Sequence, residues 1–169
     1  MADVARRAGI AKGTIYLYFD SKRALFEACI RSKISPLIGG IEQMVEDYDG
    51  ASDILLQMML TRGYSELVES DTRVLLRIII GEGHQFPELC QMHYEIGLKR
   101  GLAVMQRIID RGIQRGEFKP GIPQEYPRLL MAPCIAAAVW KMSFEPFDKL
   151  DMDSYIAGHL ELMLNGLRS

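Results

Sequence analysis

The sequence lacks the features that mark secreted, membrane-spanning and disulfide-stabilised chains. Its three cysteines, Cys29, Cys90 and Cys134, lie far apart, and no two of them form a Cys-x-x-Cys pair. No apolar run approaches the roughly 20 residues that a membrane span needs. No charged-then-apolar leader opens the chain. These absences predict reduced thiols in a cytoplasmic protein with no membrane partner.

Signatures of catalysis are missing as well. The sequence contains no Gly-rich phosphate loop, no Gly-x-Ser-x-Gly elbow and no His-Glu-x-x-His pair. Cys90 and His93 share one helix face, but even with His84 they lack a fourth metal ligand. We therefore expect neither an enzyme nor a metal or cofactor site.

Charge is unevenly distributed along the 169 residues, although the net charge is only −2. Up to Lys33 there are seven basic and three acidic residues, a net charge of +4, which leaves −6 for the rest of the chain. A basic head on an acidic body is suited to binding a polyanion through the head, although chance clustering gives a similar excess.

The basic head has the pattern of two short helices joined by a glycine turn. Residues 2–8 place Val4, Ala5 and Ala8 on one apolar helix face, and Gly9 is suited to a left-handed helix end. Ile10 is expected to pack into the small core. A second helix runs from about residue 12 to Tyr18. Asp20 or Ser21 can cap a long helix that follows.

The second helix presents an inner and an outer face. Ile15 and Phe19, four residues apart, are expected to face inward. The residues expected on the outer face are Lys12, Gly13, Thr14, Leu17 and Tyr18. They suit a DNA groove because they combine an ammonium, a glycine, a hydroxyl and an aromatic hydroxyl. Lys22 begins the long helix, where exposed amides and its ammonium can together hold a phosphate.

Beyond the head, the pattern is helical throughout. The run from Val74 to Ile80 resembles a buried strand by itself, but its helical flanks and the lack of partner strands favour a helix. Further helices are expected over about 53–69, 72–84, 87–115, 124–145 and 151–167. Pro36 is expected to bend or end the long helix, and Pro127 and Pro133 to make the 124–145 helix irregular. The fold class is therefore all-α.

The stretch AGIAKGTIYLYFDSKRALFEA resembles the signature of the TetR family of transcriptional regulators, from Val4 to about Arg31. The resemblance implies a helix-turn-helix DNA-binding domain over residues 1–33 and a helical ligand-binding and dimerisation domain over 34–169. It implies that Lys12, Gly13, Thr14, Leu17 and Tyr18 approach base edges. It further implies that Tyr16 and Lys22 hold phosphates, helped by Arg6 or Arg7. The alternative for Tyr16 is a partly buried position in the core of the head.

The chain departs from the family pattern at its start. Family members carry a further helix before this motif, whereas this sequence begins at Met1, next to the first motif helix. Without that helix we expect Val4, Ile15 and Phe26 to be partly uncovered.

The body offers candidates for a ligand pocket and for a dimer interface. Methionine and aromatic side chains adapt to varied apolar ligands, although ordinary core packing explains each of them too. The pocket candidates are Met58, Met59, Tyr64, His84, Phe86, His93, Met105, Trp140 and Phe144. The family resemblance implies a two-fold dimer built from the last two helices, with Ala136, Tyr155, His159, Leu162 and Met163 as interface candidates.

These features predict a ligand-responsive transcriptional regulator, in most cases a repressor. It would bind a palindromic double-stranded operator as a homodimer and leave it when an apolar or amphipathic small molecule binds the body. The alternative is a helical ligand-binding or interaction protein with a non-functional head.

Overall fold

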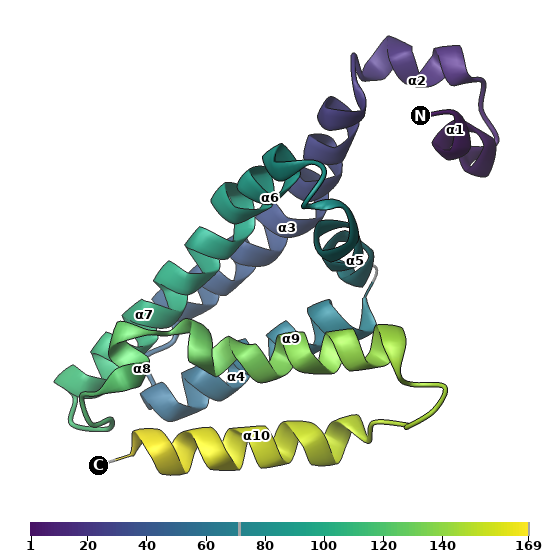
Figure 1. The fold of residues 1–169 in the computed structure, drawn as a ribbon. Coiled ribbons are helices and arrows are strands. Elements are labelled where there is room, and N and C mark those ends of the chain that lie inside the picture. The colour runs from purple at the N-terminus through teal and green to yellow at the C-terminus, as the bar shows by residue number, and fades with distance from the viewer. Residues whose placement is uncertain (71, 169) are drawn as a thin grey trace.

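The structure is a computed structural model that describes residues 1–70 and 72–168, and within these ranges it is built from helices (Figure 1). The only extended pairing there is an isolated bridge between Phe118 and Arg168. This confirms the all-α prediction. The elements are α1 (Ala2–Ala8), α2 (Lys12–Tyr18), α3 (Lys22–Asp47), α4 (Ser52–Tyr64), the π-helical η1 (Ser65–Glu69), α5 (Thr72–Glu82), α6 (Pro87–His93), the π-helical η2 (Tyr94–Leu98), α7 (Lys99–Gln114), α8 (Ile122–Glu125), α9 (Arg128–Ser143) and α10 (Met152–Leu167).

The head consists of α1 and α2, which sit together at one end of α3 (Figure 1). Gly9 ends α1 with φ 67°, as predicted. Ile15 is 4% exposed and Phe26 9% exposed, so the prediction that they would be uncovered is wrong, whereas Val4 is 44% exposed as expected. Ile10 was expected in the small core but is 43% exposed.

Helix α3 connects the head to the body without interruption. Ser21 caps it by accepting a hydrogen bond from the Ala24 amide at 3.1 Å, in agreement with one of the two predicted caps. Pro36 lies inside the helix and does not end it. The domain boundary predicted after residue 33 therefore falls within a continuous helix. Its buried face recurs every three or four residues, at Phe26, Ile30, Ile34, Ile38 and Ile41.

The predicted 87–115 helix is observed as three consecutive segments, α6, η2 and α7, that run alongside α3 (Figure 1). Gly97 in η2 permits this close approach, because a side chain there would collide with Ile34 of α3. The predicted 124–145 helix is divided into α8 and α9 next to Pro127, but α9 continues through Pro133. Asp71, a predicted helix cap, lies outside the described residues.

Two groups of buried side chains hold these helices together. The larger group lies among α4, α7, α9 and α10 and includes Leu55, Leu60 and Ile108, none of which has exposed surface. The smaller group joins the first half of α3 to α5 and α6 through Phe26, Ile30 and Leu75. None of the described helices is both long enough and apolar enough to cross a membrane.

A bidentate ion pair joins α3 to α7. Arg100 donates from Nη2 to Oε2 of Glu42 at 2.6 Å and from Nε to Oε1 at 3.1 Å. These hydrogen bonds lower the pKa of Glu42, chiefly by stabilising its charged form. A lowered carboxyl pKa adds stability above the ordinary carboxyl range, and this stability is lost as the pH falls through the folded-state pKa.

We expect Arg100→Leu to reduce the free energy of unfolding at pH 7 by about 0.5–1 kcal/mol, because the pair is partly exposed. The difference from the unsubstituted protein should shrink as the pH falls below about 4. Urea unfolding between pH 3 and pH 7 measures this. Lys99→Leu is the control, since Lys99 pairs with Glu95 within one stretch of helix. If the difference in unfolding free energy between Arg100→Leu and the unsubstituted protein stayed constant across this pH range, the stabilising role of the Glu42–Arg100 pair would be contradicted.

Candidate DNA-binding surface and effector cavity

Helix α2 presents nearly all of its predicted base-contacting side chains to solvent. Leu17 is 83% exposed and Tyr18 77% exposed, Lys12 and Gly13 are also exposed, and Thr14 is half-buried. The buried Ile15 anchors the opposite face of the helix. Large apolar and aromatic side chains held this far out of a core indicate an interaction surface.

The head also carries exposed basic side chains. Arg6 and Arg7 occupy the last turn of α1 and are exposed. The Lys12 ammonium lies 5.9 Å from the centre of the Tyr16 ring, and Tyr16 is 46% exposed, so it is not a core residue. The geometry thus gathers cations and hydroxyls beside a short exposed helix, which are the groups that contact DNA phosphates and bases.

Lys22 makes a contact that the sequence did not reveal. Its ammonium lies 4.7 Å from the centre of the Phe86 ring, which is within the range of a cation–π interaction. Phe86 belongs to the turn between α5 and α6 and packs against the smaller core group. The first turn of α3, which follows α2, therefore touches the body directly.

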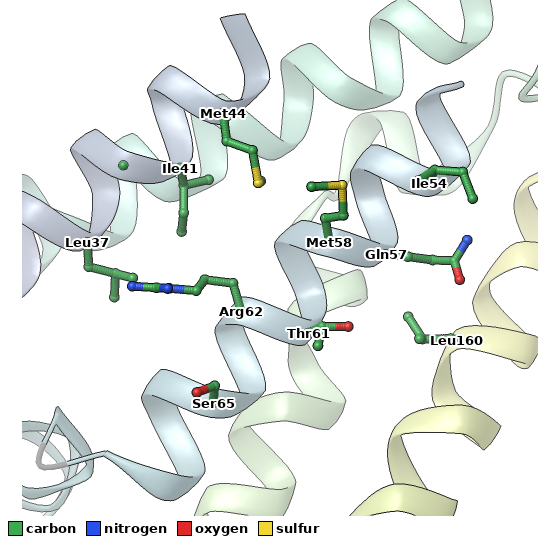
Figure 2. A pocket seen from close by; sticks show the side chains of 11 residues that line it. Leu37, Ile41, Met44, Ile54, Gln57, Met58, Thr61, Arg62, Ser65 and Leu160 are labelled. Carbon is green, nitrogen blue, oxygen red and sulfur yellow. The ribbon is translucent and has the colours of Figure 1, made fainter. Parts of the chain in front are cut away.

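An outer groove of about 630 Å³ lies between α3, α4 and α10. Figure 2 shows Met44 and Met58 extending into the gap from α3 and α4, and Arg62 extending towards Leu37. The Arg62 guanidinium also pairs with Glu66 at 3.0 Å. The wall is Leu37, Gly40, Ile41, Met44, Ile54, Gln57, Met58, Thr61, Arg62, Ser65 and Leu160.

An inner cavity of about 230 Å³ lies on the other side of Leu37 and Ile41, which line both spaces. It is bounded by α3, α4, α5, α6, α7, α9 and both π-helical segments, and most of its lining is aliphatic. Its polar wall residues are Glu66, Thr72, His93 and Arg128. Arg128 is exposed, and within the described residues no carboxylate pairs with it. The cavity thus combines an apolar interior with a cation that solvent reaches.

The nine predicted pocket residues do not gather in one place. Met58 lines the outer groove, whereas Met59 and His93 line the inner cavity. Tyr64 and Met105 belong to the larger core group. His84 is exposed and Phe86 contacts Lys22. Trp140 and Phe144 stack on each other at a ring distance of 5.0 Å near the surface.

Most of the inner wall consists of residues that the sequence analysis did not select. They include three helical glycines, Gly63, Gly97 and Gly101. Glycine inside a helix is unfavourable by about 1 kcal/mol relative to alanine. Gly97 and Gly101 lie against Ile34 and Ile38 of α3, and Gly63 lies against Met131 of α9. Such helical glycines are the sequence signal that could have pointed to this part of the body.

The predicted interface residues divide between the outside and the inside of the protein. Ala136 of α9 and Leu162 of α10 are exposed, and Leu162 retains 77% of its surface. Tyr155 donates a hydrogen bond to the Pro133 carbonyl at 3.2 Å, and His159 Nδ1 lies 2.8 Å from the Tyr64 hydroxyl. Met163 is buried. Only the first two therefore face outward.

The described residues hold no cluster suited to metal binding, and the buried thiol of Cys134 is inert. Within residues 1–70 and 72–168, no three His, Cys, Asp or Glu side chains gather as a metal site would require. Burial raises the pKa of the Cys134 thiol to about 12, which keeps it protonated and unreactive.

Comparison with known proteins matches both parts of this architecture. Residues 1–29 match the family described as bacterial regulatory proteins, tetR family, and residues 56–165 match the AefR-like transcriptional repressor C-terminal domain. The fatty acid metabolism regulator protein of Bacillus subtilis (strain 168) is 26% identical, over 100% of this chain and 85% of its own length. The HTH-type transcriptional repressor KstR2 of Rhodococcus jostii (strain RHA1) is 24% identical, over 99% of this chain and 80% of its own.

Solved structures agree with the sequence matches. The transcriptional regulator FadR from Bacillus subtilis, in complex with stearoyl-CoA, superposes with a TM-score of 0.74 at 26% identity, covering 98% of this chain and 87% of FadR. A transcriptional regulator from Mesorhizobium loti shares the fold with a TM-score of 0.70 at 21% identity, covering 99% of this chain and 86% of the other. The second domain match alone covers more than half of the chain. The chain belongs to the TetR family, a family of non-enzymatic regulators, and is a DNA-binding helix-turn-helix transcriptional repressor.

Proposed function

We propose that this repressor binds its operator through the exposed face of α2 and leaves it when an amphipathic anion occupies the inner cavity. The proposal rests on the cavity, which offers an aliphatic interior for an apolar chain and, for an anionic group, the guanidinium of Arg128, which has no carboxylate partner among the described residues. A relative of the same fold is known in complex with stearoyl-CoA, which has both parts. At about 230 Å³ the cavity is smaller than the pockets of about 300–1,000 Å³ that enclose drug-sized ligands, so it would hold only an apolar part of such a ligand.

We also propose a two-fold homodimer joined through α9 and α10, acting in the cytoplasm on a palindromic site. Apolar side chains stay exposed along these helices, among them Leu129 at 51% and Leu162 at 77%. Ala136 lies between Leu129 and Trp140 on the exposed face of α9, where its small side chain allows close helix approach. Two-fold symmetry would present two α2 helices to major grooves about 34–36 Å apart.

The proposed route from cavity to DNA runs through the elements that the two share. Helix α3 lines the cavity at Ile34, Leu37 and Ile38, and its first turn adjoins α2. Helices α5 and α6 also line the cavity, and the turn between them carries the Phe86 ring beneath Lys22. A ligand that favours one arrangement of these helices biases the spacing of the heads, but only by its differential affinity for the two arrangements.

A substitution that fills the inner cavity is expected to impair the response to effector without impairing DNA binding. We expect Leu102→Trp to keep operator affinity within about threefold while weakening release by decanoic acid or stearoyl-CoA at least tenfold, because the indole occupies the ligand's space. Mobility shift with increasing ligand measures both quantities. Ile54→Trp, which alters the outer groove instead, is the matched control and should respond normally.

Two outcomes would contradict this proposal. Failure of both ligands to release DNA from the unsubstituted protein would reject the effector class. Loss of release in Ile54→Trp but not in Leu102→Trp would place the effector in the outer groove instead.

A further inference from the structure

A thin partition of side chains separates the inner cavity from the outer groove. Leu37 and Ile41 of α3 line both spaces and therefore stand between them. An ion pair continues the partition, because Glu66 lines the inner cavity, Arg62 lines the outer groove, and their charged groups lie 3.0 Å apart. Figure 2 shows the Arg62 side chain extending from its helix towards Leu37. A few side chains thus divide a space of about 230 Å³ from one of about 630 Å³.

The size of the inner cavity limits how much of a ligand it can enclose. A buried apolar cavity of about 150 Å³ takes up benzene with its six carbons, so about 230 Å³ has room for roughly nine carbons. We infer that Leu37 sets this limit and determines the specificity of the cavity for medium-chain over long-chain ligands. A longer chain would have to cross the partition into the outer groove. The inference rests on the proposed effector cavity and adds the length of the ligand's apolar part.

Among the members of the partition, Leu37 is the residue whose size can change the limit. Ile41 is 7% exposed and belongs to the larger core group, so its position is fixed by its neighbours. The Arg62–Glu66 pair lies partly in solvent, and separating such a pair costs little. Leu37 is half-buried and packs only against the side of that core group. Shortening Leu37 should therefore open the partition while the core stays in place.

The outer groove can receive the end of a chain that passes the partition. Met44 and Met58 extend into it, and the flexible thioether side chain of methionine adapts to apolar ligands of varied shape. Each methylene group that leaves water strengthens binding about fourfold. In the unsubstituted protein this gain should end when the inner cavity is full. In Leu37→Ala it should continue into the outer groove.

A series of saturated acids tests the inference by calorimetric titration of the full chain: hexanoic, octanoic, decanoic, dodecanoic and tetradecanoic acid. Decanoic acid has nine carbons beyond its carboxyl group. In the unsubstituted protein we expect affinity to rise up to decanoic acid and then to level off or fall. Leu37→Ala should bind tetradecanoic acid at least tenfold more tightly than decanoic acid. Met44→Ala is the matched control, because Met44 lines only the outer groove and its loss should leave the length limit unchanged.

Leu37→Val keeps the test decisive if Leu37→Ala does not fold. It removes a single carbon and should move the limit in the same direction by a smaller amount. Tighter binding of tetradecanoic than of decanoic acid by the unsubstituted protein would overturn the inference but leave the effector cavity in place. An unchanged length limit in the folded Leu37 variants, or an equal gain in Met44→Ala, would have the same consequence. If no acid binds the unsubstituted protein, the proposed effector class itself fails, and the inference fails with it.

Discussion

Tyr18→Ala is expected to weaken operator binding about 100-fold while leaving the fold intact. Tyr18 is 77% exposed at the end of α2, so its ring contributes little to the stability of the head. A side chain that contacts a base contributes about 1–3 kcal/mol, and the proposed homodimer would use it twice. Fluorescence anisotropy on a duplex selected by the full chain from a random library measures the loss.

The control for this substitution is Tyr94→Ala, which removes the same side chain from a 44% exposed position on η2 in the body. It should leave affinity within about twofold, because an ordinary surface substitution changes little. Affinity retained in Tyr18→Ala would show that α2 does not read the operator. Loss of affinity together with a lower Tm would show that the ring supports the head instead.

Phe118→Ala is expected to lower the free energy of unfolding by about 3–5 kcal/mol, which corresponds to a fall of about 10 °C in Tm for a chain of this size. Phe118 is 2% exposed, and its ring lies against Gly112 of α7. The adjacent Lys119 amide donates to the Leu167 carbonyl of α10 at 2.9 Å. Phe118 therefore packs where the end of α7 meets the end of α10, and removal of its ring should leave a cavity there.

Thermal unfolding followed by circular dichroism measures this loss. Phe147→Ala is the matched control, because Phe147 keeps 88% of its surface exposed and should leave the Tm within about 2 °C. A fall of less than about 3 °C in Phe118→Ala would show that the surrounding helices collapse into the space at little cost.

The helices and the turn of the head could be predicted from the sequence, because they are determined by residues close together in the chain. The order of short helix, glycine turn and short helix depends on neighbouring residues, and both Gly9 and the Ser21 cap are observed. Ile10 shows the limit of this reasoning. Ile10 lies in the turn between α1 and α2, where the sequence shows that the residue is apolar but not which element covers it.

The inner cavity was harder to predict because it is made by the packing of segments that lie far apart in the sequence. Met59 and His93 were among the predicted pocket residues and line the cavity. Trp140 and Phe144 were predicted as pocket residues because they are aromatic, but they lie at the surface. The π-helical segments add a further difficulty, because each changes the helix face that the following residues occupy. Both segments, Ser65–Glu69 and Tyr94–Leu98, contribute to the cavity wall.

If Lys22 binds a phosphate and the inner cavity binds the effector, as proposed, the contact between Lys22 and Phe86 would make chromosomal DNA a competitor of the effector. Lys22 is expected to leave the ring when it binds a phosphate, so DNA binding changes the turn between two cavity-lining helices. Coupling of this kind is reciprocal: any DNA that engages Lys22 lowers effector affinity by the factor by which effector lowers DNA affinity. In the cell, where non-specific DNA is abundant, the repressor should therefore need a higher effector concentration for release than the purified protein does. Raising the salt concentration weakens non-specific DNA binding and should reduce this difference.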